Sequence, residues 1–142
     1  MPGNISPIYA KVARIGYAQI GSTGPTGADL TSASLLFTAD ATNGSIITDI
    51  SIRVLPVNGF IPAVVRFWIN NGGAVSTTTN NTLFSEITMP LISVTQTAAT
   101  NEFILTMPRG GLVLPPGYRV YCALGTWGLS GTLMVTAQGG DY

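Results

Sequence analysis

Hydrophobic and polar residues alternate with a period of two along most of this chain, which is the pattern of strands with one buried face. Gly, Pro or Asn interrupts the alternation about every ten residues, as in sandwiches and barrels. Residues 8–142 are therefore predicted to form a single β-sandwich domain, an all-β antiparallel sandwich of jelly-roll type. We expect about eight strands, over residues 8–20, 34–39, 46–55, 63–70, 83–95 with a break at Pro90, 102–107, 118–125 and 132–138. A short helical turn is expected only within residues 76–82.

The alternation also predicts which side chains point inward. If Asn58-Gly59 closes a tight hairpin, Ile52 lies opposite Val65 and Ile50 opposite Phe67, so both apolar faces agree. The other residues predicted to point inward are Ile46, Thr48, Val54, Ile69, Phe103, Leu105, Met107, Val120, Cys122, Leu124, Leu133, Val135 and Ala137. Those predicted to point outward are Arg66, Trp68, Glu86, Glu102, Arg119 and Tyr121.

Charged residues are scarce in this composition. They make up 8% of the chain, against about 25% in ordinary globular proteins, while hydrophobic residues make up 46%. A monomer of this mass exposes roughly 7,000 Å², which so few charged side chains cannot cover. With a net charge of zero, little repulsion keeps free copies apart. We therefore expect an oligomer or a larger assembly.

Several classes of partner are not expected. The six basic residues are spread singly along the chain, whereas nucleic-acid binding needs a concentrated basic patch. The N-terminal residues lack the basic and apolar segments of a signal peptide, and no run is long enough for a membrane helix. The sequence therefore predicts a protein made in a cytoplasm, without nucleic-acid or membrane partners.

The sequence also lacks the residues that most enzymes use. It contains no histidine, and its one cysteine, Cys122, lies in an apolar run. We expect no catalytic residue, no cofactor and no metal site. The remaining enzymatic alternative is a glycosidase with two carboxyl groups about 5 to 9.5 Å apart. Its candidates are Asp29, Asp40, Asp49, Glu86, Glu102 and Asp141.

Trp68 is the central interface candidate. An outward Trp beside an outward Arg is enriched at the centres of protein interfaces, so Arg66, Trp68 and Tyr121 are candidate contact residues. Trp68 could instead be covered by loops of its own chain. Trp127, in a glycine-rich turn, could face a ligand or plug one end of the sandwich. Together with Tyr118, these aromatic residues leave a second function open, namely that of a module that binds glycans.

Three stretches resemble small virion proteins of tailed bacteriophages: residues 37–45, residues 66–72, and residues 112–118 together with the ending Gly139-Gly140-Asp141-Tyr142. The resemblance spans nearly the whole chain and is closest to head decoration, or cement, proteins. It implies a jelly-roll homotrimer on the outer capsid surface of a virion, bridging neighbouring major capsid proteins. The alternative within such particles is a tail-fibre or baseplate module that recognises host glycans.

Cement proteins often use a flexible terminal arm that orders on docking. Residues 1–7 contain Pro2, Gly3 and Pro7, and we interpret them as such an N-terminal arm. The candidate contact residues in it are Met1, Pro2, Gly3, Asn4 and Ile5.

Overall fold

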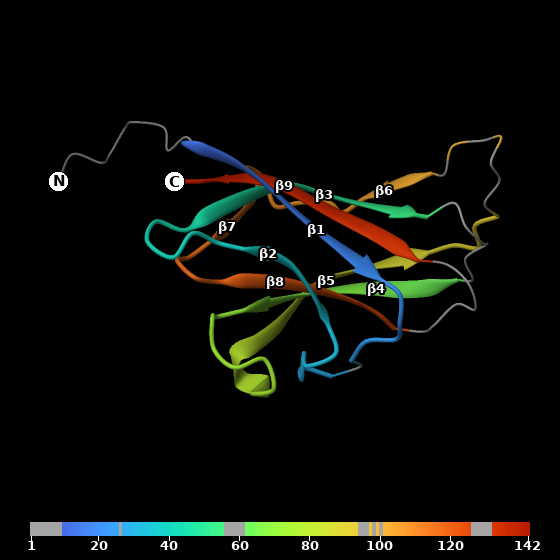
Figure 1. Cartoon of the computed structure of the whole chain (residues 1–142), viewed down its shortest axis with the longest axis horizontal. Coiled ribbons are helices and arrows are strands. Elements are labelled where there is room, and N and C mark those ends of the chain that lie inside the picture. Colours follow the sequence, from blue (N-terminus) through green and yellow to red (C-terminus); the bar gives the residue numbers. More distant parts are fainter. Residues whose placement is uncertain are drawn as a thin grey trace.

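The computed structural model describes residues 10–25, 27–55, 62–93, 97, 99, 101–125 and 132–142. Within these residues the chain forms nine strands and one 3-10 turn, η1 (Figure 1). In chain order they are β1 (Val12–Ile20), β2 (Ser34–Thr38), β3 (Ser45–Val54), β4 (Ala63–Asn70), η1 (Thr78–Asn80), β5 (Asn81–Met89), β6 (Glu102–Ile104), β7 (Leu112–Leu114), β8 (Arg119–Leu124) and β9 (Leu133–Asp141). A helix long and apolar enough to cross a membrane does not occur in this described part.

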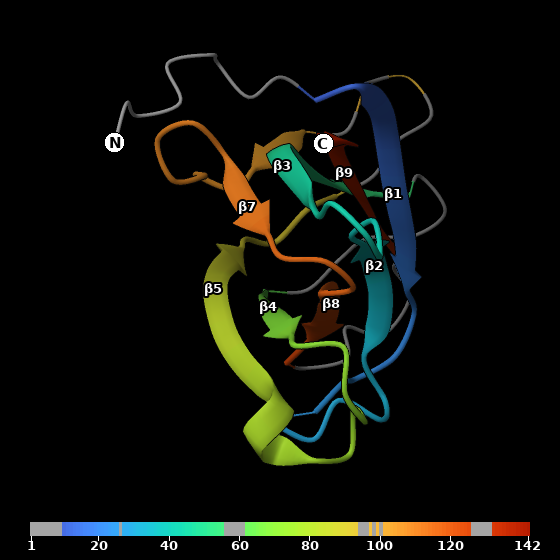
Figure 2. The ribbon, with the colours of Figure 1, turned by 90° about the vertical axis from the view of Figure 1, so that its left-hand side faces the viewer.

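The strands form two antiparallel sheets that pack face to face, seen as two layers in Figure 2. Sheet A has the order β1-β9-β3-β6, and β7 pairs with the other end of β3 on the β6 side. Sheet B has the order β2-β8-β4-β5. With β6 and β7 taken as one interrupted strand, these orders are those of an eight-stranded jelly roll. The predicted fold class is confirmed.

The hydrophobic core lies between the two sheets. It is built by alternate residues of the strands, and Ile50, Ile52, Val65 and Phe67 are completely buried there. Complete burial of each such side chain contributes about 1.5–3 kcal/mol to folding. The residues predicted to point inward on β8 and β9 are also buried: Val120, Cys122, Leu124, Leu133, Val135 and Ala137.

The predicted hairpin between β3 and β4 is wrong. β3 lies in sheet A and pairs with β9, β6 and β7, whereas β4 lies in sheet B between β8 and β5. Ile52 and Val65 therefore belong to opposite sheets and both enter the same core. Alternation determines which face of a strand is buried, but it does not select the partner strand. The loop over residues 56–61, with Asn58-Gly59, lies outside the described residues.

Two inward predictions on β3 are also wrong, because the register with β9 shifts between Ile47 and Asp49. Such a bulge adds one residue and reverses the faces on one side of it. Ile47 is consequently buried, while Ile46 is half-buried opposite Gly140, and Thr48 is exposed. Period-two counting through the bulge had given the opposite assignment.

Other local predictions differ mainly in length. The short helical turn is confirmed as η1, and β5 ends at Met89, directly before Pro90, which cannot donate to a ladder. The three-residue strand β7 had no counterpart in the sequence prediction. β9 continues to Asp141, beyond the predicted end at residue 138.

Candidate functional site

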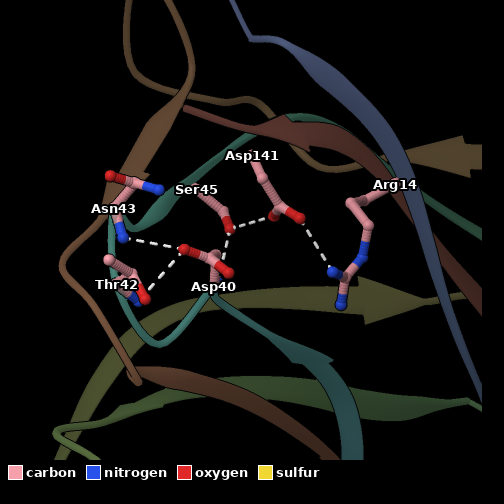
Figure 3. Close-up of polar contacts among 6 residues, drawn as sticks. All are labelled: Arg14, Asp40, Thr42, Asn43, Ser45 and Asp141. Atoms are coloured by element: carbon pink, nitrogen blue, oxygen red, sulfur yellow. Dashed lines mark hydrogen bonds and ion pairs between the residues drawn. The ribbon is translucent and has the colours of Figure 1, made fainter.

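A polar network around the buried residues Ser45 and Asp141 joins three strands of sheet A near the end of the chain (Figure 3). Arg14 Nη1 on β1 donates to Asp141 Oδ2 on β9 at 2.8 Å. The hydroxyl of Ser45 on β3 donates to Asp141 Oδ1, and its oxygen accepts the backbone N–H of Asp40 at 2.9 Å. Both carboxylate oxygens of Asp141 are thus occupied. The network stabilises the junction of β1, β3 and β9, and both carboxylate oxygens of Asp141 serve this structural role.

Asp40 organises the turn that leads from β2 to β3. Its Oδ1 accepts the backbone N–H groups of Asn43 at 2.7 Å and Thr42 at 3.0 Å (Figure 3). These bonds favour the carboxylate and lower the pKa of Asp40. Its carbonyl oxygen accepts the N–H groups of Gly44 and Gly117, which ties this turn to the one before β8. The role of Asp40 in this geometry is structural.

Two of the candidate acids of a glycosidase, Asp29 and Asp40, accept hydrogen bonds that lower their pKa. Hydrogen bonds from the hydroxyl and backbone N–H of Thr31 lower the pKa of Asp29. Two further candidates form ion pairs: Glu86 with Arg66 at 2.6 Å and Glu102 with Arg53 at 3.1 Å. A glycosidase needs a general acid with a raised pKa. The lowered pKa values of Asp29 and Asp40 are the opposite of this requirement.

The described residues also contain no group of three or more His, Cys, Asp or Glu side chains that could hold a metal ion. Cys122 is buried in the core, where desolvation raises the pKa of its thiol to about 12. Because the thiolate is the nucleophilic form, this cysteine is unreactive in the folded chain.

The part of the outer face of sheet B around Trp68 and Tyr121 is covered by loops of the same chain, and this corrects the prediction for these two residues. Trp68 is 3% exposed and Tyr121 is 9% exposed. Both pack in a second apolar cluster with Leu30 and Ala123, against which Ala33 and Val75 also pack. The alternative left open for Trp68, cover by its own chain, is the one observed.

Backbone and amide hydrogen bonds hold this loop cover in place. The Leu30 N–H donates to the carbonyl oxygen of Val75, joining the loop after β1 to the loop between β4 and β5 (Figure 2). Asn81 Nδ2 donates to the carbonyl oxygens of Ala28 and Val75 at 2.6 and 2.7 Å. Asn70 Nδ2 donates to Asn81 Oδ1, so sheet B itself anchors both loops.

Of the remaining predicted contact residues, Arg66 lies within the part of the chain that the structure describes. Arg66 is half-buried and paired with Glu86 on the neighbouring strand, so its charge is already compensated. Trp127 and the candidates from Met1 to Ile5 lie outside the described residues.

The outer face of sheet A is the surface that the sequence reasoning missed. Four of its large apolar side chains are solvent-exposed: Ile15 (69%), Tyr17 (72%), Ile104 (60%) and Val113 (59%). A signal existed in β1, where Ile15 and Tyr17 have one parity and the buried Ala18 and Ile20 have the other. A strand that is apolar on both faces buries one of them in the core and leaves the other for a different contact.

Comparisons with protein-family models, with curated proteins and with solved structures returned no match. The functional argument therefore rests on the residues and their arrangement.

Proposed function

We propose that this chain is a structural virion protein that decorates and stabilises a bacteriophage capsid by binding across neighbouring major capsid proteins, as a homotrimer. The main support is a β-sandwich with one outer sheet face that exposes four large apolar side chains. A protein that functions by packing against neighbours needs such a surface and no catalytic group. The capsid as binding partner and the homotrimer are taken from the resemblance of the sequence to head decoration proteins.

The alternative function, a host-recognition module that binds glycans, receives less support. It depended on exposed aromatic side chains at Trp68, Tyr118, Tyr121 and Trp127. Trp68 and Tyr121 are buried under loops, and Tyr118 is half-buried. A sugar-binding platform needs accessible aromatic faces, which these three residues do not provide.

The test is to mix the purified chain with particles that lack it and to measure co-sedimentation and light scattering. The proposal predicts a trimer that sediments with the shells and raises their resistance to heat or chelators. A chain that ignores the shells but is retained by host cell-surface glycan would support the recognition module instead.

A further inference from the structure

We propose that copies of this chain bind one another through the outer face of sheet A. The proposal rests on the proposed function in that it identifies the contact of the expected homo-oligomer. Among the described residues, eight large hydrophobic side chains are strongly exposed, and five of them belong to strands of sheet A. On sheet B, by contrast, the chain's own loops cover Trp68 and Tyr121. Sheet A therefore presents the larger uncovered apolar surface.

Strand register places the exposed side chains at the two sides of this face. One row across the sheet runs from Tyr17 on β1 through Thr136 and Ser51 to Ile104 on β6. The parallel row toward the other end runs from Ala13 through Gly140 and Ile46 to Val113. In the first row, large apolar side chains thus flank the small residues Thr136 and Ser51 of the central strands, whereas in the second row the central strand β3 carries Ile46.

This arrangement favours a second copy as the occupant. Tyr17 of one copy can pack over the small residues Thr136 and Ser51 of another, so that projecting side chains meet a low part of the surface. Sheets that pack face to face combine side chains in this way at about 10 Å separation. In a trimer, each copy would offer the Tyr17 side of this face to one neighbour and the central strands to the other, so one sheet face supplies both halves of a head-to-tail contact.

The charges of the face also permit self-association. Two identical faces carry the same net charge, so an excess of either sign would repel a second copy. Here Arg53 and Glu102 lie in one row and neutralise each other, with a 3.1 Å contact between Arg53 Nη2 and Glu102 Oε2. Asp49 adds one further carboxylate, and one of its oxygens is buried. A strongly charged partner such as a nucleic acid finds little complement on this surface.

The area of the face is sufficient for a specific contact. Strands about 4.8 Å apart that rise about 3.3 Å per residue give four strands of this length a footprint of roughly 500 Å². Two copies then remove about 1,000 Å² from solvent, near the lower limit for specific interfaces. A contact of this size predicts an assembly that mutations at its centre can dissociate.

The test is light scattering after size-exclusion chromatography on the wild-type chain and on the double variant Tyr17→Thr/Ile104→Thr. Threonine retains strand propensity while removing large apolar surface. We expect the wild type to be oligomeric at micromolar concentration and the double variant to assemble at least about tenfold more weakly. The matched control is Leu83→Thr, which removes a 47% exposed side chain from β5 in sheet B and should leave assembly unchanged.

Thermal melting of all three proteins establishes that each is folded. A monomeric wild type, or a folded double variant that assembles like the wild type, would overturn the proposed contact. Binding to particles is measured separately on the same samples. An oligomer that the double variant dissociates but that never binds shells would refute the virion role and leave the self-contact standing.

Discussion

Ser45 is the pivot of the polar network in sheet A. It is completely buried, and its hydroxyl both donates to Asp141 and accepts the N–H of Asp40. Asp141 also forms an ion pair with Arg14 on the edge strand β1. A carboxylate with only 11% of its side chain exposed needs such donors, because a buried charge without partners is costly. Ser45 therefore helps to make the end of β9 compatible with burial.

Replacing Ser45 with Ala should lower the free energy of unfolding by about 1–3 kcal/mol, because it leaves a buried carboxylate oxygen without its donor. Urea denaturation at neutral pH measures the change. Ser51→Ala, on the same strand but on the outer face, is the matched control and should change stability by less than about 0.5 kcal/mol. Equal effects of the two substitutions would show that the network contributes nothing particular.

The lowered pKa of Asp40 predicts that the stability of the fold depends on pH. Its pKa is lowered in the folded chain by the N–H groups of Asn43 and Thr42, relative to about 3.9 when unfolded. The stabilisation is therefore fully present above the unfolded pKa and is lost as pH falls through the lower folded pKa. Between about pH 5 and pH 2, the wild type should lose more stability than Asp40→Asn, whose side chain does not titrate. Parallel curves from urea denaturation would contradict this assignment.

Trp68 should act as a core residue, which is one of the two roles that the sequence left open for it. Trp68→Ala removes a large buried side chain from the cluster with Leu30 and Tyr121, and such truncations cost about 3–5 kcal/mol. Denaturant unfolding should show this loss, with a smaller one for Trp68→Phe. A variant of normal stability but altered oligomeric state would restore the interface interpretation.

At the level of elements, the pairing of β3 with β9 is central to sheet A, because both strands have neighbours on each side. The ladder extends over almost the whole of both strands and contains the bulge between Ile47 and Asp49. Gly139 lies opposite Ile47 at this bulge, and a Cβ atom there would collide with the carbonyl oxygen of Ile46. The close backbone approach explains why glycine occupies this strand position.

Gly139→Ala should consequently destabilise the protein by at least about 1–3 kcal/mol, because the two strands must separate to admit the methyl group. Thermal unfolding measures the loss as a lower midpoint. Gly27→Ala serves as the control, since a Cβ atom at Gly27 meets no atom within 4 Å. A similar midpoint for both variants would mean that the ladder yields at little cost.

At the level of the whole molecule, the two outer faces of the sandwich have different fates. Loops of the chain cover the Trp68 side of sheet B, and amide hydrogen bonds of Asn81 fasten them. Sheet A keeps Ile15 and Tyr17 in solvent. This asymmetry directs the search for partners to sheet A.

Deletion of residues 1–7 provides a further test of the whole assembly. Because β1 begins at Val12, the truncated chain retains every strand that the structure describes and should melt like the wild type. We expect weaker attachment to particles, since these residues are proposed as a docking arm. Quantitative gels of sedimented shells give the occupancy, and undiminished occupancy would remove this role for the arm.

Much of the fold followed from the sequence alone. Period-two alternation identified the eight main strand regions, and β4 was predicted with its observed bounds, Ala63–Asn70. Inward positions such as Val65, Phe67 and Cys122 were also correct. Burial of alternate apolar side chains is a local property of each strand, so the order of residues suffices to reveal it. The lack of charge likewise follows from composition.

Tertiary structure alone decided which strands pair and which outward residues remain exposed. Ile52 and Val65 lie in different sheets, because alternation is equally satisfied by any partner that shares the core. Trp68 is buried because Leu30, from the distant loop after β1, packs on it beside Val75 of the loop after β4. The same long-range packing leaves Tyr17 uncovered. Contacts between remote segments depend on the path of the chain in space, which residue periodicity does not encode.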